Sequence, residues 1–265
     1  MERLMVIKLD GQGCTAEAWL NGLPVARVTP LTPSSVVPVH EAALVGTNRL
    51  ELVVGPDGGA PGAAALLGTA PHAMVAQLHL LLPRMDHAID EAQARTLARL
   101  EWSCAAGDPL TLPARRVQDA ELPIRFPRWR WLDAPVAQPT PTLVQQVHAF
   151  VCVLARDLAR GQTESFMAAT RLRTEELAIA YQRSPESEAL RLSEWLDQMY
   201  ASSCLVWQPL MLDEMQLRPL AGGRLLECLG GDGRAALTTM PDKAGNTLAL
   251  PLKLSVVEGR FYVLR

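Results

Sequence analysis

The chain is short of aromatic residues and carries no excess of charge of either sign. Its 265 residues include six Trp, three Tyr and four Phe, and 25 basic side chains nearly balance 28 acidic ones. The resulting net charge of −3 creates no overall field that would hold a polyanion. The composition therefore excludes a nucleic acid held by bulk electrostatics.

The cysteines are too few and too scattered to form a structural framework. They are odd in number and include no C-x-x-C pair, which argues against disulfide scaffolds and zinc ribbons. The five positions are Cys14, Cys104, Cys152, Cys204 and Cys228. We expect buried, chemically inert thiols.

Long apolar runs are missing as well. The longest candidate, residues 73–82, is interrupted by Gln77 and His79 and ends at Pro83. A membrane helix needs about 18 or more consecutive apolar residues, so this stretch is too short. The first residues, MERLMVIKLD, lack the apolar core of a signal peptide. The sequence predicts a cytoplasmic protein with no membrane partner.

Complete catalytic and metal-binding motifs are also absent. The chain has neither a G-x-S-x-G nucleophile elbow nor a phosphate-binding G-x-x-x-x-G-K-[ST] loop. The glycine-rich residues 230–233 are more simply a hairpin turn. A polar stretch could hold a metal if residues 86–94 were helical, but it lacks the H-E-x-x-H order and equally fits a solvated helix end. It contains His72, His79, Asp86, His87, Asp90 and Glu91. We expect neither a metal nor a cofactor.

Length and hydrophobicity favour two domains. Apolar residues make up 49% of the chain, enough for full-sized cores. Residues 133–142 read DAPVAQPTPT, and three prolines among small residues are typical of a stiff spacer. We therefore predict a domain over residues 1–132, a linker over 133–142 and a second domain over 143–265.

The region before the linker is patterned as short strands. Residues 16–20 and 23–28 flank Asn21-Gly22, a strong hairpin signal because both turn residues must adopt positive φ. Further alternating stretches lie at residues 36–40, 49–54, 74–82, 96–104, 110–117 and 122–132. The pattern predicts an all-β antiparallel sandwich of the jelly-roll kind.

The region after the linker begins with helices and ends with strands. Thr142-Leu-Val-Gln145 fits a capping box, and Gly161 fits the end of that first helix. Shorter helices are predicted over residues 164–171, 174–181 and 185–201. Strands are predicted over 205–212, 215–220, 224–229, 235–240, 248–257 and 261–265. This order indicates an α+β fold in which helices pack on an antiparallel sheet.

Two resemblances follow from these residues. WLNGLPVARV and VVPVHEAALVGTNRLELVV, within residues 19–54, are similar to strands of galactose-binding-like β-sandwich domains, which implies a sandwich and sugar binding. Residues 215–220, AGGRLLECLGGDGRAAL and the terminal LPLKLSVVEGRFYVLR resemble the SnoaL-like, nuclear-transport-factor-two-like superfamily. That resemblance implies an α+β cone with a pocket, and homodimers through the outer sheet face. Its members include enzymes, binders and scaffolds, so it identifies no reaction.

The most basic stretch of the chain is a candidate binding surface. Residues 125–131 read RFPRWRW, and as a strand they would place Arg128 and Arg130 on one face and Trp129 and Trp131 on the other. Arginine beside exposed indole binds sugars, anions or single-stranded nucleic acid by charge and stacking. The alternative is a final strand whose Trp pair packs into a core.

A second candidate site is a pocket in the C-terminal cone. Such pockets combine apolar walls with a few polar groups, and the expected lining is Tyr200, Trp207, Arg218, Arg224 and Glu227. A catalytic base would have to be Asp213 or Glu227 with a pKa raised by burial.

These observations favour a ligand- or protein-binding protein without catalysis of its own. The first alternative is a small-molecule isomerase, cyclase or hydrolase acting in the cone pocket. The second is carbohydrate recognition by the sandwich. We expect a homodimer formed through the C-terminal domain, with a small molecule or a protein as partner.

Overall fold

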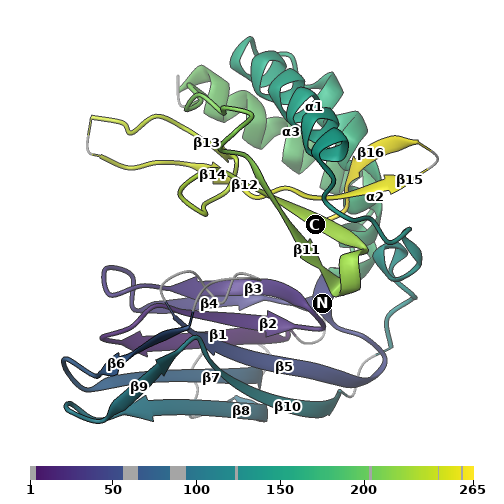
Figure 1. Cartoon of the computed structure of the whole chain (residues 1–265). Helices are drawn as coiled ribbons and strands as arrows, with labels where there is room; N and C mark the ends of the chain where they lie inside the picture. Colours follow the sequence, from purple (N-terminus) through teal and green to yellow (C-terminus); the bar gives the residue numbers. More distant parts are fainter. Residues whose placement is uncertain are drawn as a thin grey trace. The chain divides into compact units, whose positions relative to one another are not determined.

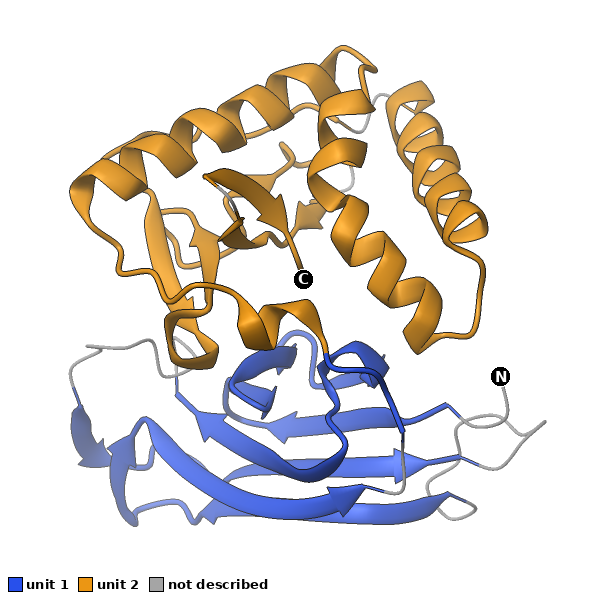
Figure 2. Ribbon diagram, turned by 90° about the vertical axis from the view of Figure 1, so that its right-hand side faces the viewer, with its two compact units in different colours: residues 1–128 blue, residues 129–265 orange. Residues whose placement is uncertain are grey.

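The computed structural model describes residues 4–55, 65–83, 94–122, 125–202, 205–243, 245–257 and 259–265 (Figure 1). The chain divides into two compact units, residues 1–128 and residues 129–265 (Figure 2). The first unit is built from antiparallel strands, and the second contains three helices followed by further antiparallel strands. The predicted order of a β-rich region followed by an α+β region is confirmed. The helix predicted over residues 86–94 lies almost wholly outside the described residues.

The first unit contains two four-stranded sheets and one pair of short strands. The sheet orders are β4-β1-β7-β8 and β10-β5-β2-β3, and β6 pairs with β9. The bounds are β1 Val6–Gln12, β2 Ala16–Leu20, β3 Leu23–Val28, β4 Ser34–Pro38, β5 Gly46–Val54, β6 Leu66–Thr69, β7 Met74–Leu82, β8 Arg95–Cys104, β9 Pro109–Leu112 and β10 Ala114–Leu122. A short 3-10 helix, η1, covers His40–Ala42.

Alternating side chains bury the inner faces of both sheets. Leu78 and Leu80 of β7, and Leu50 and Leu52 of β5, are fully buried. Next to these leucines, Gln77 of β7 is partly exposed and Glu101 of β8 is exposed, and Gln77 Nε2 donates a hydrogen bond of 2.7 Å to Glu101 Oε1. Asn21 and Gly22 adopt φ values of 53° and 78°, as the predicted hairpin between β2 and β3 requires.

A buried asparagine holds the loop that precedes β5. Asn48 is fully buried, and its Oδ1 accepts hydrogen bonds from Leu44 N (2.7 Å) and Asn21 Nδ2 (2.8 Å). Its Nδ2 donates to Leu44 O (2.7 Å) and Gly46 O (2.8 Å). Asn48 therefore uses all its hydrogen-bonding capacity to join this loop to the Asn21 hairpin.

The second unit begins with three helices, α1 Pro141–Ala159, α2 Glu164–Ala180 and α3 Pro185–Ala201. Helix α1 starts two residues earlier than its predicted capping box at Thr142 implies, because Pro141 occupies the first helical position and Thr140 is the N-cap. Gly161 follows the end of α1 with a φ of +73°, as predicted. The two short helices predicted over residues 164–171 and 174–181 are one continuous helix, inside which the Thr174 hydroxyl donates to Thr170 O (3.1 Å).

Replacing the cap residue tests the start of α1. Thr140 Oγ1 accepts the Leu143 N–H at 3.2 Å, so Thr140→Ala leaves that amide without its acceptor. We expect a loss of about 1 kcal/mol in the free energy of unfolding, measured by urea denaturation. Thr142→Ala, inside the first turn, is the matched control and should change stability by less than about 0.5 kcal/mol. A larger loss in the free energy of unfolding for Thr142→Ala than for Thr140→Ala would instead support the predicted capping box at Thr142.

The connection between α1 and α2 is tied by an ion-paired carboxylate. Asp157 Oδ2 accepts a 2.8 Å hydrogen bond from Ser165 Oγ, and Oδ1 accepts two bonds of 3.1 Å from Arg156. The Ser165 hydroxyl and the Arg156 guanidinium hold the pKa of Asp157 below its ordinary value. The Tyr200 ring packs against Gly161, where a Cβ would lie 2.9 Å from the ring.

The strands of the second unit form a four-stranded antiparallel sheet in the order β11-β12-β15-β16 and a short pair, β13-β14. Their bounds are β11 Gln216–Leu220, β12 Leu225–Leu229, β13 Leu237–Thr238, β14 Ala249–Leu250, β15 Lys253–Val257 and β16 Arg260–Val263. One face packs on the helices in a core that includes Val151, Leu154, Leu226 and Leu254. The strand predicted over residues 205–212 is wrong, since that segment makes one isolated bridge, between Trp207 and Thr239.

The proline-rich segment 133–142 belongs to the second unit. Ala137 N donates to Gly223 O at 2.9 Å, and Arg224 Nη1 donates to Ala134 O at 2.8 Å. Gly223 follows the turn after β11, part of the 3-10 helix η3 Ala221–Gly223. These bonds hold the segment predicted as a linker against the rest of the second unit. Within the described ranges, the structure has no helix long and apolar enough to cross a membrane.

Candidate functional site

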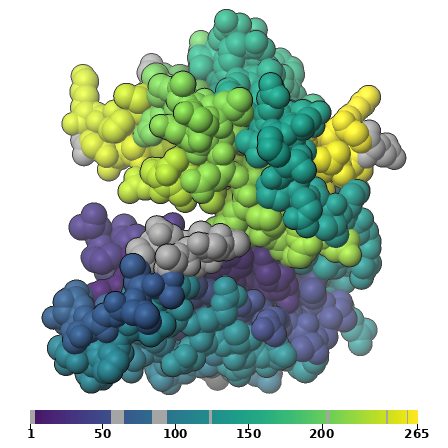
Figure 3. All heavy atoms as spheres, in the orientation of Figure 1, coloured from purple at the N-terminus to yellow at the C-terminus, as the bar shows by residue number. Residues whose placement is uncertain are grey.

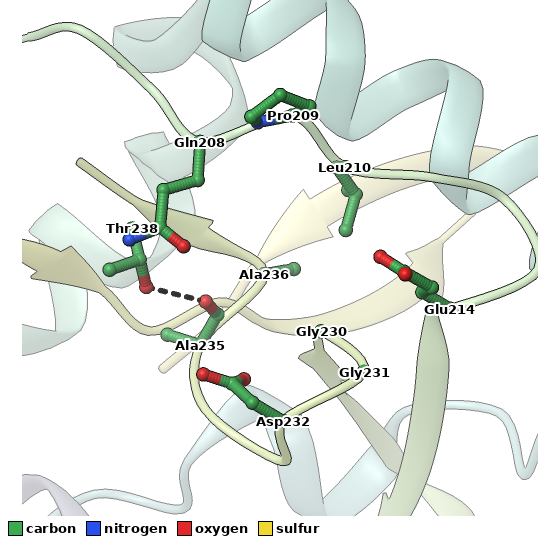
Figure 4. A pocket seen from close by; sticks show the side chains of 10 residues that line it. All are labelled: Gln208, Pro209, Leu210, Glu214, Gly230, Gly231, Asp232, Ala235, Ala236 and Thr238. Atoms are coloured by element: carbon green, nitrogen blue, oxygen red, sulfur yellow. Dashed lines mark hydrogen bonds between the residues drawn. The ribbon is translucent and has the colours of Figure 1, made fainter. Parts of the chain in front are cut away.

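A pocket of about 280 Å³ opens in the second unit, beside the turn that follows β12 (Figure 4). One wall is the loop that leads into β11, and the other is the hairpin turn between Leu229 and Ala235. The lining consists of Gln208, Pro209, Leu210, Glu214, Gly230, Gly231, Asp232, Ala235, Ala236 and Thr238. Helix α1 (teal) borders the light-green loop in the space-filling view (Figure 3), and His148 Nε2 lies 2.8 Å from Leu210 O.

Two carboxylates from separate segments face this pocket. Glu214 is directed from the start of β11 toward Leu210 and Ala236, and Asp232 lies in the glycine-rich turn (Figure 4). Asp232 Oδ1 accepts the Arg234 N–H at 2.9 Å, and Arg234 Nε lies 3.7 Å from Asp232 Oδ2. Residues 230–233 are a hairpin turn, as predicted, since Gly230 N donates to Arg234 O at 2.9 Å.

The remaining polar side chains of the lining each donate one hydrogen bond to a neighbouring backbone carbonyl. Gln208 Nε2 donates to Thr239 O at 3.0 Å, and Thr238 Oγ1 donates to Ala235 O at 2.7 Å. The Gln208 carbonyl oxygen and the Thr238 lone pairs are left as acceptors. The side-chain lining therefore offers one N–H donor of Gln208, several acceptors and the negative charge of two carboxylates.

Among the described residues, burial raises the pKa of three thiols, which is the opposite of nucleophilic activation. Cys152 lies one turn from His148 on α1, with Sγ 3.6 Å from Nε2, but burial raises the pKa of Cys152. His148 Nε2 carries its proton, because only an N–H can satisfy the Leu210 carbonyl oxygen at 2.8 Å. Burial also raises the pKa values of Cys14 and Cys228.

Glu227, one of the two predicted catalytic bases, is held in a cross-strand ion pair. It lies opposite Arg218 on β11 and Lys253 on β15. Arg218 Nη2 is 2.5 Å from Glu227 Oε2, and Lys253 Nζ is 4.0 Å from Oε1. Proton abstraction by Glu227 would break a buried ion pair, which is costly. The other predicted base, Asp213, lies in an exposed turn and is absent from the pocket lining.

The residues expected to form the cone pocket are dispersed. Tyr200 is about half exposed and packs on Gly161, and Arg224 bonds to the Ala134 carbonyl. Trp207 packs against the core of the unit, and its buried Nε1 has no hydrogen-bond partner among the described residues. The pocket therefore forms beside Trp207 rather than around Arg218 and Glu227.

The predicted surface strand carrying Arg128, Trp129, Arg130 and Trp131 is wrong. Residues Arg130–Asp133 form a 3-10 helix, η2, and both indoles are almost fully buried. Glu176 favours this helical turn over a strand, because its Oε1 accepts the Arg130 backbone N–H at 2.5 Å. Its Oε2 accepts a 2.5 Å hydrogen bond from Arg265 Nη1, and the Arg265 guanidinium lies 5.7 Å from the Trp129 ring centroid. The two indoles therefore do not form an exposed stacking platform.

The outer face of the first unit has a second hollow, of about 340 Å³. It is lined by Gln77, Glu101, Ser103, Arg116, Val75 and Trp102. Glu101 is already bonded to Gln77 and ion-paired with Arg99. Trp102 is 7% exposed, so it presents little ring surface for stacking.

Neither Glu214 nor Asp232 is among the site residues that the sequence predicts. The predicted base Asp213 is one residue from Glu214, and Asp232 falls in the predicted hairpin turn over residues 230–233. The signal that could have found them is two acids in separate turns flanking one β-strand pair, β11 and β12.

Comparison of the chain with protein-family models and with curated proteins finds no match. The assignment of function therefore depends on the geometry of the pocket.

Proposed function

We propose that this chain is a ligand-binding protein without catalysis of its own, and that the pocket beside Gly230 and Gly231 is its binding site. The observation that carries the proposal is the lining itself, a concave site with convergent polar groups. Among the described residues, the lining holds no histidine, cysteine or lysine, and Glu227 is engaged elsewhere. Recognition needs only such complementary groups, whereas proton transfer needs a group poised near neutral pH.

We also propose a jelly-roll-like sandwich of the galactose-binding-like kind for the first unit and a SnoaL-like cone for the second. The stacked four-stranded sheets support the first assignment, and the three helices on a four-stranded antiparallel sheet support the second. Residues 141–202 contain no strand between their helices, which is a departure from the early hairpin of that superfamily. A cytoplasmic location is part of the same proposal.

Filling the pocket tests whether it is the binding site. Ala235→Phe places a ring among the lining residues, and Ala106→Phe, in an exposed turn of the first unit, is the matched control. We expect polar metabolites, screened by amide NMR, to shift the signals of Gly231 and Ala236 in the wild type and the control.

In Ala235→Phe these shifts should disappear while the circular dichroism spectrum is unchanged. A screen in which bound compounds shift other amides, or shift the same ones equally in Ala235→Phe, contradicts the proposed function.

A further inference from the structure

Strand β10 forms one edge of its sheet in the first unit. It pairs with β5 over nine consecutive positions, from Ala114 to Leu122, without a register shift. Among the described residues, no strand pairs with the other side of β10 (Figure 1). An edge of this kind presents backbone N–H and C=O groups that can pair with a further strand.

The other edge strands of the two sheets carry features that discourage such pairing. Short strands, prolines and bulges protect the edges of natural sheets. Strand β4 is five residues long and ends at Pro38, and β3 contains Pro24. The pairing of β3 with β2 and of β8 with β7 is interrupted by a register shift. Strand β10 has neither a proline nor a register shift, so its charged side chains decide what it pairs with.

The charges of β10 follow an order along the strand. Arg115 and Arg116 come first, Asp119 and Glu121 come later, and all four side chains are exposed. An antiparallel partner runs in the opposite direction, so a second copy of β10 brings its acids to the arginines of the first. Parallel pairing would instead place like charges together. The strand is therefore complementary to itself in the antiparallel direction.

One register uses this complementarity fully. Side chains alternate between the faces of a strand, so Arg115, Val117 and Asp119 share one face. A two-fold axis beside Val117 places this residue opposite its own copy, with an Arg115–Asp119 pair between the copies on each side of it. Directly opposite residues of opposite charge, and β-branched apolar pairs, stabilise antiparallel strands.

The contact between β5 and β10 already follows the same rule. Arg115 forms an ion pair with Glu51 of β5 while its side chain remains 51% exposed, and Asp119 lies opposite Arg49. The alternation of charge that joins β5 to β10 therefore continues across the added strand.

We infer that β10 pairs with β10 of a second copy of this chain, in an antiparallel two-fold dimer centred on Val117. The dimer joins two four-stranded sheets into one sheet of eight strands. It lies in the first unit and goes beyond the proposed function, which concerns a pocket of the second. One strand pair buries less than the roughly 1,200–2,000 Å² of a standard interface, so the dimer should be weak.

Sedimentation velocity on the full chain, between about 1 and 100 µM, tests this dimer. We expect the sedimentation coefficient to rise from that of a monomer toward that of a dimer. Asp119→Arg places arginine opposite Arg115 of the second copy, and Arg115→Asp places aspartate opposite Asp119. Each variant alone should weaken the dimer by about tenfold or more, because both opposite-charge pairs become like-charge pairs.

Mixing the two variants tests the register. In a mixed dimer every arginine of Asp119→Arg faces an aspartate of Arg115→Asp, so an equimolar mixture should dimerise about as well as the wild type. Glu194→Arg makes the same change of charge at an exposed position of α3 and should leave dimerisation unchanged. The circular dichroism spectra of all three variants should match that of the wild type.

Three outcomes would overturn the inference. The first is a wild-type chain that stays monomeric at about 100 µM. The second is a dimer that both charge reversals leave intact, since it would then form through another surface, such as the sheet of the second unit. The third is a pair of variants that are monomeric alone and stay so when mixed. The proposed function survives all three, because the Ala235→Phe experiment tests it separately.

Discussion

Glu176→Gln should lower the free energy of unfolding by about 3–5 kcal/mol, because it removes the counter-charge of a buried guanidinium. The side chains of Glu176 and Arg265 are each 5% exposed, and their charged groups lie 2.5 Å apart. Glutamine also replaces one of the two acceptor oxygens that serve Arg265 and the Arg130 backbone amide. Urea denaturation followed by circular dichroism measures the loss.

The neighbouring residue provides the control. Glu175 pairs with Arg130 and Arg171 at 2.6 Å, but its side chain is 29% exposed. Solvent weakens such pairs, so Glu175→Gln should cost about 1 kcal/mol or less. Adding Arg265→Met to Glu176→Gln should recover part of the stability, since replacing both charges is less costly than orphaning one. Equal losses in Glu175→Gln and Glu176→Gln would contradict this account.

Asn48→Asp should destabilise the first unit by about 3 kcal/mol at neutral pH. The substitution keeps the shape of the side chain but turns its donor group toward Leu44 O and Gly46 O into an acceptor. Two carbonyl groups lose their donor, and a carboxylate is placed against them where the wild-type side chain is fully buried.

The pH dependence distinguishes this cause from simple loss of packing. In acid the introduced carboxyl is protonated and regains one donor, so the difference from the wild type should narrow as the pH falls. Gln118→Glu makes the same chemical change at an exposed position of β10 and should shift stability by less than about 0.5 kcal/mol. A loss that does not vary with pH would point to packing alone.

The elements that could be predicted from the sequence are those specified locally. The Asn21-Gly22 turn, strands such as β11 and the Gly161 helix end depend on residues within a few positions of one another. The start of α1 was misplaced because Pro141 supplies the first helical position, so the cap moves to Thr140.

Contacts between residues that are far apart in the sequence explain the predictions that were wrong. RFPRWRW alternates like a strand, but Glu176 on α2 takes the Arg130 amide and fixes η2 instead. Arg218 and Glu227 have the residue types of a pocket, but their cross-strand register pairs them with each other. Glu214 and Asp232 line one pocket because β11 and β12 bring two turns to the same end of the sheet, which the predicted strands indicate only once their pairing is known.

The Glu176–Arg265 pair also sets an order of events during synthesis. The two residues are 89 positions apart, so at about 5–20 residues per second the carboxylate is made roughly 4–18 s before its partner. Until then α2 carries an acid that water must solvate, and the second unit cannot close around it. Asn48, by contrast, follows its partner Asn21 by only 27 residues. The first unit therefore has both partners of this buried hydrogen bond while the second unit is still being synthesised.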